Sequence, residues 1–445
     1  MKISVIGAGY VGLVSGACLA DKGHEVVCVD IDKEKVDQIN NAKAPIYEKG
    51  LTEILNRTVG KTFFATTDLH RSVVGSQLTL VAVGTPFDGR NIDLSYIRAV
   101  SEQIGTALRS KTDYHAVVVK STVVPGTTDG LVLPLLGKHS GKEAGEGFGV
   151  GMNPEFLTEG QAMADFMNPD RIVLGANDRR TAEILEELYD SFKGTPVVRT
   201  NCRTAEMIKY ASNAMLAVQI SFTNEIANLC SALGGIDVVD VMEGVHLSHY
   251  LYPETRDAGR FRAPISSFLE AGCGFGGSCL PKDVRALIAH GEEAGAQMPV
   301  LSAVMETNDK QYKRIIDLIY KHYQSLENLR VSILGLSFKP DTDDMRESPA
   351  IPIIRMLMEQ GAAVKAYDPE AKGEALKIFG GTPLRLCQTL EEALLDIDVA
   401  ALVTRWDHFK IVPDLLERLS PNALLVDGRR MIDKRSYRRY DGIGM

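Results

Sequence analysis

The chain has 445 residues, of which 45% are hydrophobic and 24% charged, a composition typical of an ordinary globular protein. At roughly 150 residues per domain, this length predicts about three domains, each large enough to bury a core. The formal net charge of −9 argues against a general nucleic-acid or anionic-membrane surface.

Cysteine usage and the apolar runs set the expected compartment. The seven cysteines are odd in number and scattered, with no C-x-x-C pair, which favours a reducing compartment over a disulfide framework. The apolar run near the N-terminus superficially resembles a signal peptide, but glycines interrupt it. No later stretch offers about 18 uninterrupted apolar residues, so we expect no membrane span. We therefore expect a cytoplasmic protein.

The segment from Lys2 to Asp30 combines a strand, a glycine-rich turn, a helix and a second strand. Residues Lys2 to Ile6 are a β-branched run that predicts a buried strand, and G-A-G-Y-V-G follows at once. This order matches the dinucleotide fingerprint, whose glycines make the turn, admit the pyrophosphate and pack helix on strand. Asp30 ends the second strand and would accept hydrogen bonds from the adenosine ribose, which favours NAD over NADP. A tight turn without a ligand is the alternative.

Polar residues follow the next predicted strands. One strand over 78–83 ends shortly before Thr85, and another over 116–122 ends at Thr122. Ligands of open parallel sheets bind outside the carboxyl ends of strands, so these threonines are placed to face cofactor or substrate. For either threonine taken singly, a strand-end or turn residue is an equally good explanation. A further strand runs into Asn153-Pro154-Glu155, which aims a carboxylate at a cleft. Glu159 would share its face if a helix begins there, but a first-turn helix acid explains Glu159 as well.

A long apolar pattern from Arg203 to Gly234 has few breakers and predicts one long helix. Lys209 and Asn213 lie four residues apart and therefore on one face of it. Most such lysines are merely solvated, but this one sits among apolar residues, where an ammonium needs a partner. The helix is apolar on more than one face, which predicts a dimer interface along it. A second amphipathic helix is expected over about 300–323.

The glycine-rich segment G-C-G-F-G-G-S-C-L-P-K-D, residues 272–283, lies between these helices. Its glycines let backbone and ligand approach closely. If Pro281 opens a helix, Cys279 sits at the helix N-terminus, where the dipole and the Lys282 ammonium favour thiolate, a nucleophile for a carbonyl. A buried structural cysteine in a turn is the alternative. Cys273 has no nearby cation in sequence and is expected to stay a neutral thiol.

Alternation of strands and helices restarts at Arg330, with strands predicted over 331–336, 363–368, 399–404 and 423–430. The first turn carries a single glycine in place of the triple-glycine fingerprint. We therefore expect a second doubly wound domain that binds something other than a dinucleotide. Cations at strand ends would suit an anionic ligand there: Lys339, Arg346, Arg429 and Arg430. For Arg346, a salt-bridged loop among neighbouring acids is an equally good explanation.

Together these motifs resemble those of the nucleotide-sugar 6-dehydrogenases, most closely the UDP-glucose 6-dehydrogenases. The resemblance covers nearly the whole chain and rests on G-A-G-Y-V-G, P-I-Y-E-K-G-L, V-G-T-P, K-S-T-V-V-P-G-T, N-P-E-F-L-T-E-G, K-x-x-x-N, G-F-G-G-S-C-L-P-K-D and F-K-P-D-T-D-D-M-R-E-S-P. It implies oxidation of the C6 alcohol of UDP-glucose to the carboxylate of UDP-glucuronate, with two NAD⁺ consumed per sugar. It also implies a homodimer or larger homo-oligomer, and no metal.

The expected fold class is α/β, with two doubly wound, Rossmann-like parallel-sheet domains joined by a central helical domain. The expected boundaries are 1–200 for the NAD-binding domain, 201–325 for the central domain with the cysteine and the dimer interface, and 326–445 for the UDP-sugar-binding domain.

The resemblance implies roles for the matched residues. Cys279 would hold the C6 aldehyde as a thiohemiacetal and then as a thioester, which water hydrolyses. Lys209 and Asn213 match residues that stabilise the developing oxyanion. Asp283 and Thr122 match residues that position a water.

Two glutamates complete the implied chemistry. Glu155 matches the proposed base of the hydrolysis, and Glu159 an acid near the cofactor and the water. The expected cofactor contacts are Gly7, Gly9, Tyr10, Val11, Gly12, Asp30, Lys35, Thr85, Thr122 and Glu159. The expected substrate contacts are Glu155, Phe156, Leu157, Lys209, Asn213, Arg260, Phe275, Gly276, Lys339 and Arg429. The family also brings an arginine from a neighbouring subunit, and either Arg260 or Arg262 can fill that role.

Other readings stay open from sequence. GDP-mannose and N-acetylated UDP-hexosamines are alternative substrates. The 3-hydroxyacid dehydrogenases share the fingerprint and K-x-x-x-N but need no thiol, so the G-F-G-G-S-C segment and the last domain weigh against them. A nucleotide-sugar sensor without turnover would keep the fold, but the presence of all the chemical residues argues against it.

Overall fold

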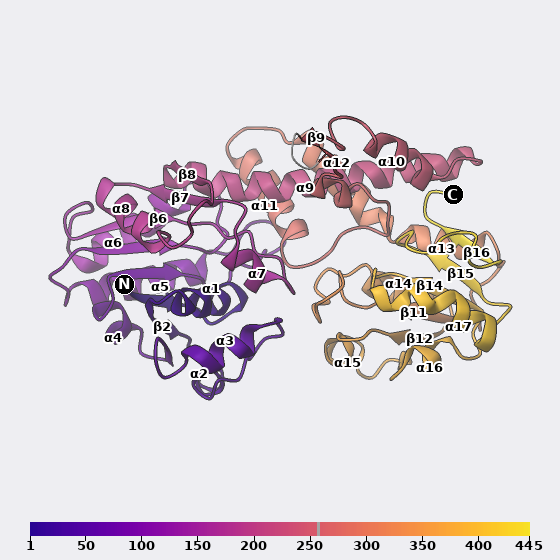
Figure 1. Ribbon diagram of the computed structural model, residues 1–445, viewed down its shortest axis with the longest axis horizontal. Coiled ribbons are helices and arrows are strands. Elements are labelled where there is room, and N and C mark those ends of the chain that lie inside the picture. Colours follow the sequence, from indigo (N-terminus) through magenta and orange to yellow (C-terminus); the bar gives the residue numbers. More distant parts are fainter. Residues whose placement is uncertain (256–258) are drawn as a thin grey trace. The chain divides into compact units, whose positions relative to one another are not determined.

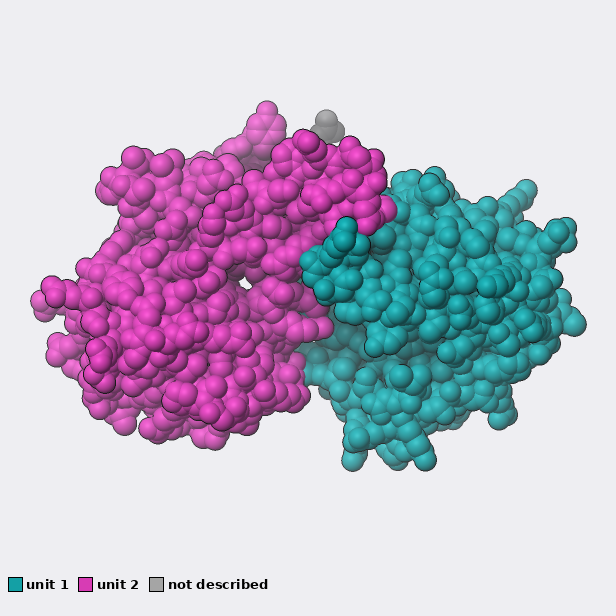
Figure 2. All heavy atoms as spheres, turned by 180° about the vertical axis from the view of Figure 1, so that it is seen from behind, with its two compact units in different colours: residues 1–212 teal, residues 213–445 magenta. Residues whose placement is uncertain are grey.

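The computed structural model describes the backbone of residues 1–255 and 259–445, and the side chains of these except 254, 255, 259 and 260. The chain divides into two compact units, residues 1–212 and 213–445 (Figure 2). Each unit contains an α/β sheet flanked by helices (Figure 1). Helix α9 (Cys202–Leu233) continues through the boundary and matches the long helix predicted from sequence.

The strands of the first unit form one sheet. They are β1 (Lys2–Ile6), β2 (Glu25–Val29), β3 (Phe63–Thr66), β4 (Leu78–Val81), β5 (His115–Val119), β6 (Phe148–Met152), β7 (Ile172–Ala176) and β8 (Val197–Thr200). Among the described residues their order is β3-β2-β1-β4-β5-β6-β7-β8. All neighbours pair in parallel except β6 and β7, which are antiparallel. The order reverses direction between β1 and β4, as a doubly wound sheet requires.

The first sheet is buried on both faces, as continuous apolar strands predict. In β5, Ala116 and Val118 belong to one core cluster, whereas Val117 and Val119 belong to another. Successive side chains of a strand point to opposite faces, so these clusters are the two layers between sheet and helices. The helices are α1 (Tyr10–Asp21), α2 (Lys33–Asn40), α3 (Leu51–Thr58), α4 (Leu69–Val74), α5 (Ser95–Leu108), a π-helical turn (Thr128–Val132), α6 (Leu133–Ser140), α7 (Ala162–Met167) and α8 (Arg179–Leu188).

The second unit is built on a parallel sheet of the same doubly wound order. Its strands are β11 (Arg330–Leu334), β12 (Ala363–Tyr367), β13 (Arg385–Leu386), β14 (Val399–Leu402), β15 (Leu424–Asp427) and β16 (Tyr440–Gly442). Their order in the described residues is β13-β12-β11-β14-β15-β16. Ile333 and Leu334 face different core clusters, so this sheet too is covered on both faces. The short β13 and β16 had no signal in the sequence.

The remaining elements of the second unit are mainly helices. They are α10 (Val238–His246), the hairpin β9 (Glu254–Thr255) and β10 (Gly259–Arg260), a 3-10 helix (Pro264–Phe268), α11 (Leu280–Glu293), α12 (Pro299–Gln311), α13 (Lys313–Tyr320), α14 (Ala350–Glu359), α15 (Lys372–Phe379), α16 (Leu390–Leu394), a 3-10 helix (Asp407–Ile411) and α17 (Val412–Leu419).

The single helix predicted over 300–323 is wrong, because it is divided at Tyr312 into α12 and α13, although the backbone of Tyr312 itself stays in the right-handed helical region. At this break, the buried side chain of Gln311 donates to the carbonyl of Gly272 at 2.9 Å. Within the described residues, no helix is both long and apolar enough to cross a bilayer.

Candidate active site

The fingerprint turn between β1 and α1 has the geometry that its glycines predict. Gly7 has φ of +103°, and a Cβ there would lie 2.6 Å from the carbonyl oxygen of Ala82. A Cβ at Gly12 would lie 1.9 Å from the carbonyl oxygen of Gly7, so this glycine packs helix on turn. A Cβ at Gly9 would meet nothing within 4 Å. Open space at the N-terminus of α1 fits a pyrophosphate, which helix amides and dipole stabilise.

Asp30 lies beside this turn, at the carboxyl end of β2. Its two carboxylate oxygens accept hydrogen bonds from the backbone amides of Ala8, at 2.8 Å, and Asp32, at 2.9 Å. The carboxylate is thereby fixed next to the glycine turn, and its remaining lone pairs can accept ribose hydroxyls. Lys35 lies in the first turn of α2, and its amide is capped by Asp32. The position of the Asp30 carboxylate beside the glycine turn therefore fits the ribose of NAD.

Two of the predicted cofactor residues meet at the carboxyl edge of the sheet. Thr85, which follows β4, donates its hydroxyl to the carbonyl oxygen of Thr122, which follows β5, at 2.8 Å. The adjacent parallel strands β4 and β5 therefore bring together residues that are far apart in sequence.

Tyr10, inside the fingerprint, is held by the P-I-Y-E-K-G-L motif. Its hydroxyl donates to the buried carboxylate of Glu48, which also accepts from the amide of Gly160 at 2.8 Å. Burial, followed by the bond to Glu48, raises the pKa of Tyr10. The motif thus ties the fingerprint to the loop that carries Glu155 and Glu159. Val11 follows in α1 and packs against the core.

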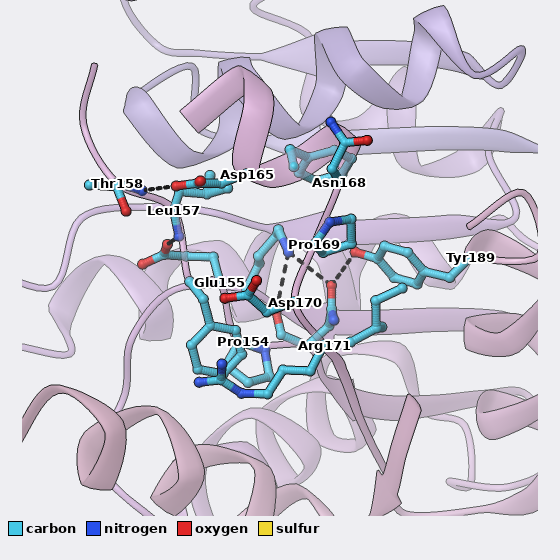
Figure 3. Close-up of a pocket in the computed structure, with 15 residues that line it drawn as sticks. Pro154, Glu155, Leu157, Thr158, Asp165, Asn168, Pro169, Asp170, Arg171 and Tyr189 are labelled. Carbon is cyan, nitrogen blue, oxygen red and sulfur yellow. Dashed lines mark hydrogen bonds between the residues drawn. The ribbon is translucent and has the colours of Figure 1, made fainter. Parts of the chain in front are cut away.

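Glu155 and Lys209 form a buried ion pair in the first unit. Their charged atoms lie 3.1 Å apart, and the side chains are only 6% and 4% exposed, respectively. The other Glu155 oxygen accepts from the amide of Leu157 at 2.6 Å (Figure 3). Burial acts to raise the pKa of Glu155, but Lys209 and that amide outweigh it and hold the pKa below its ordinary value. Glu155 is thus a partner for the Lys209 ammonium, which the apolar sequence around Lys209 led us to expect.

The N-P-E-F-L-T-E-G segment is an irregular loop, and α7 begins only at Ala162. Glu155 and Glu159 therefore share no helical face, contrary to the conditional expectation. Phe156 stacks against Arg171, whose guanidinium carbon lies 3.9 Å from the ring centroid. Arg171 was missed in the sequence, where N-P-D-R carries no recognisable signal.

Cys279 lies at the N-terminus of α11, as predicted from Pro281. All seven cysteines are among the described residues, and Cys279 is the exposed one, whereas the other six are buried. The ammonium of Lys282 binds the carboxylate of Asp283 at 2.6 Å, and its effect on the Cys279 thiol stays a prediction. The position of Cys279 at the N-terminus of α11 is one that favours a thiolate.

Asp283 is buried beneath the first turn of α11, with an exposure of 1%. One carboxylate oxygen accepts from Lys282, and the other accepts from the Asn213 side-chain amide at 2.6 Å. The structure thus brings together Asn213, expected at the oxyanion, and Asp283, expected to position a water. A helix that starts at Leu280 directs both Cys279 and Asp283 from one turn.

Side-chain amides of three residues hold the glycine-rich segment in place through hydrogen bonds to its backbone. Asn224 accepts from the amide of Gly272 at 2.8 Å, and Gln311 donates to its carbonyl. Asn308 accepts from the amide of Phe275 at 2.8 Å and donates to its carbonyl at 3.1 Å. Sequence reasoning missed these residues, although Asn224 interrupts an apolar helix pattern, which is the one signal that could have found it.

The glycines of this segment let other backbone approach closely, as the sequence predicts, but at Gly276 and Gly277 the space that a side chain would take is filled by the chain itself and not by a ligand. A Cβ at Gly276 would lie 2.2 Å from the carbonyl oxygen of Glu347, and one at Gly277 would lie 2.7 Å from the ring of Phe338. The amide of Gly277 donates to the carbonyl of Arg346 at 2.8 Å. The F-K-P-D-T-D-D-M-R-E-S-P loop therefore packs against the glycine-rich segment that carries Cys279.

Cys273 is a buried thiol that lies 3.6 Å from the carbonyl oxygen of Val403. Burial raises the pKa of this thiol, as expected for a neutral structural cysteine. No cation is near Cys273 in sequence, but the fold brings up Arg429, whose charge acts to lower the pKa of the thiol against the larger effect of burial.

The four strand-end cations that the sequence singled out in the second unit differ in their contacts: two lie near the glycine-rich segment or the loop around Phe338, and two are paired with carboxylates. Arg429 donates to the carbonyls of Val403, at 2.6 Å, and Gly274, at 3.0 Å, and Lys339 lies beside the ring of Phe338. Arg430 instead forms a buried pair with Asp237 at 2.8 Å, so it is structural. Arg346 pairs with Asp344 at 2.7 Å, which agrees with the salt-bridged loop.

Arg260 and Arg262 are the two arginines that could reach the active site of a neighbouring subunit, and the structure describes the side chain of Arg262. Arg262 is engaged within its own unit, with Ser266 at 2.7 Å and Glu270 at 3.3 Å. The side chain of Arg260 lies outside the described part of the chain.

Comparison with known proteins places this geometry in a family. Three models of the UDP-glucose/GDP-mannose dehydrogenase family match the chain: the NAD binding domain over 1–193, the central domain over 203–310 and the UDP binding domain over 332–434. UDP-glucose 6-dehydrogenase AglM of Haloferax volcanii is 40% identical over 448 residues, covering all of both chains. GDP-mannose 6-dehydrogenase of Pseudomonas aeruginosa is 41% identical over 443 residues, covering 97% of this chain and 96% of its own length.

A solved structure agrees with the fold. The UDP-glucose dehydrogenase of Pyrobaculum islandicum superposes with a TM-score of 0.89 at 36% identity, covering 99% of this chain and 97% of that one.

Proposed function

The chain belongs to the UDP-glucose/GDP-mannose dehydrogenase family and binds NAD, and we propose that it oxidises the C6 alcohol of UDP-glucose to a carboxylate. The observation that carries this proposal is the exposed Cys279 at the start of α11, above the buried Asp283. A one-step alcohol dehydrogenase needs no such nucleophile, whereas a two-step oxidation needs to retain its aldehyde.

Cys279 and Lys209 serve the two oxidations. When bound, NAD⁺ supplies the hydride acceptor. Lys209 and Asn213 hold the oxygen on C6 as its charge develops. The Cys279 thiolate adds to the aldehyde carbon, which forms a carbon–sulfur bond and retains the product of the first oxidation as a thiohemiacetal. Loss of a second hydride leaves a thioester on the same sulfur.

Glu155, Asp283 and Thr122 serve the hydrolysis. Asp283 and Thr122 position a water, and Glu155 accepts its proton as the oxygen attacks the thioester carbonyl. The carbon–sulfur bond breaks, and Cys279 leaves as a thiolate. Glu155 can act as a base because Lys209 and the Leu157 amide keep it ionised. Glu159 stands near the cofactor in this scheme.

The remaining assignments follow the three matched segments. Residues 1–200 hold NAD, 201–325 carry the nucleophile and 326–445 hold the UDP-sugar. The predicted substrate contacts that we keep beyond the reacting centre are Phe156, Leu157, Arg260, Phe275, Lys339 and Arg429. Lys339 and Arg429 supply the positive charge for a diphosphate. Exposed apolar side chains on α9, Met215, Phe222, Leu229 and Leu233, support a homodimer along this helix.

GDP-mannose is the second candidate substrate, because a GDP-mannose 6-dehydrogenase matches this chain as well as the UDP-glucose enzymes do. The test is NADH absorbance with UDP-glucose, GDP-mannose and UDP-N-acetylmannosamine at equal concentrations. We expect UDP-glucose to give the highest kcat/KM, with NAD⁺ preferred over NADP⁺. Faster turnover of another sugar reassigns the substrate, and turnover of none of them refutes the proposed function.

A further inference from the structure

Lys120 is an ammonium buried at the carboxyl end of β5, with an exposure of 3%. Its nitrogen lies 2.9 Å from the side-chain oxygen of Asn153 and 3.4 Å from the Asn153 carbonyl. In the described part of the chain, no carboxylate is bonded to it directly. A buried charge whose hydrogen-bond partner is a neutral amide costs free energy, so its presence requires a reason.

The cavity beside Lys120 has a volume of about 130 Å³, and the loop that carries Glu155 forms part of its lining (Figure 3). The charged and titratable side chains that line it come from several elements: Lys120 after β5, Glu155 after β6, Asp165 in α7, Asp170 and Arg171 before β7, and Tyr189 after α8. The ring of Phe166 lies 5.8 Å from the ammonium. Glu155 and, from α9, Lys209 are the charged groups that act on Lys120 most strongly.

The fold does not need the charge of Lys120. Asn153 also accepts from the hydroxyl of Tyr189, and its amide donates to the carbonyl of Val173 at 2.9 Å. The Asn153-Pro154-Glu155 turn therefore keeps its polar partners without the lysine. An apolar side chain of similar length would fill the site without desolvating a charge, so stability alone would favour methionine here.

Glu155 is the group that gains from this charge. Its direct partner is Lys209, but the proposed reaction requires Lys209 to donate to the sugar oxygen while Glu155 remains ionised. A buried carboxylate left without any cation takes up a proton more readily and can then no longer act as a base. Lys120 is the other cation that acts on Glu155.

We propose that Lys120 is a positioning residue for thioester hydrolysis, the second counter-ion that keeps Glu155 ionised while Lys209 is engaged by the sugar. This inference rests on the proposed function. In the step it supports, water oxygen bonds to the thioester carbon, Glu155 takes the water proton, and the sulfur of Cys279 leaves with the bonding electrons. Lys120 exchanges no proton in this step. Burial lowers the pKa of Lys120 to about 8, so it is mainly charged at neutral pH.

Without Lys120, the pKa of Glu155 rises, so the acid limb of the hydrolysis rate moves to higher pH. We expect a shift of about one pH unit, the lower end of the effect of a nearby opposite charge. At a pH below that limb, hydrolysis slows about tenfold. Lys120→Arg keeps the charge and should leave the limb where the wild type has it.

The experiment compares wild type, Lys120→Met, Lys120→Arg and a control, Lys111→Met. Lys111 is a half-buried lysine of the same unit that donates to the carbonyls of Val74 and Ser76, away from the cavity. Single-turnover NADH release and the intact protein mass are measured from pH 5.5 to 9 with saturating UDP-glucose, beside the thermal midpoint. Lys120→Gln, which keeps a donor toward Asn153 without the charge, substitutes if Lys120→Met does not fold.

We expect the uncharged Lys120 variant to retain the wild-type thermal midpoint or exceed it, and to accumulate a covalent sugar adduct at low pH. Lys120→Arg and Lys111→Met should show neither change. An unshifted acid limb in the uncharged variant overturns the inference, and so does equal loss in Lys120→Arg. Absence of NADH release by the wild type refutes the proposed function instead.

Discussion

Glu155→Gln tests the buried ion pair that underlies the proposed chemistry. The substitution keeps the shape of the side chain but removes the charge 3.1 Å from the Lys209 ammonium. Both side chains are almost fully buried, so Lys209 is left as a charge that water cannot reach. Breaking a buried pair in this way costs about 3–5 kcal/mol. That is a large part of the roughly 5–15 kcal/mol that holds a typical domain folded.

Urea unfolding followed by circular dichroism measures this loss, and the double variant Glu155→Gln/Lys209→Met is the matched control. Because the double variant buries no ammonium at position 209 that has lost its carboxylate, we expect it to recover most of the lost stability while remaining inactive. A loss below about 1 kcal/mol in Glu155→Gln would show that the pair is solvated. A further loss in the double variant would contradict the assignment of the cost to Lys209.

Three further predictions follow from exposure and charge. Because Cys279 is exposed, iodoacetamide should alkylate it first in the native protein and abolish turnover, whereas the variant Cys273→Ala should keep most of its activity. Mass spectrometry of peptides locates the label, and first labelling of another cysteine contradicts the assignment. The charges of Arg430 and Lys434 outweigh the effect of burial and hold the pKa of Asp237 at about 2. The stability that Asp237 contributes is therefore full above the pKa of an unfolded aspartate and is lost between about pH 4 and 2. In Asp237→Asn, the urea midpoints of unfolding at pH 6 and pH 3 should differ less than in the wild type. Phe222→Glu places a charge on the exposed apolar face of α9 and should lower the mass measured by light scattering to that of one chain; a wild type that is already monomeric removes the proposed interface.

Local patterns were enough to predict much of the fold. The β-branched runs predicted the central strands of both sheets, and the G-A-G-Y-V-G turn predicted α1 because only glycine tolerates the contacts found at Gly7 and Gly12. Pro281 placed Cys279 at a helix start for the same kind of local reason. The break at Tyr312 had no such signal, since amphipathic periodicity continues across it.

The supports of the site could not be predicted because they depend on contacts distant in sequence. Asn308 and Gln311 look like polar helix residues until the fold places them under the glycine-rich segment. Gly276 looks like a ligand-facing glycine, but the carbonyl of Glu347 occupies the space. Lys120 looks like a solvated strand-end lysine, and only the structure shows that it is buried beside Asn153.

Retention of the aldehyde by Cys279 is the central claim, and the yield of NADH per sugar tests it most directly. With limiting UDP-glucose and excess NAD⁺, the wild type should release two NADH for each sugar and produce the uronic acid without free aldehyde. Cys279→Ala should bind NAD⁺ and sugar nucleotide but yield no uronic acid. Two NADH per sugar and a uronic acid from Cys279→Ala would contradict the account.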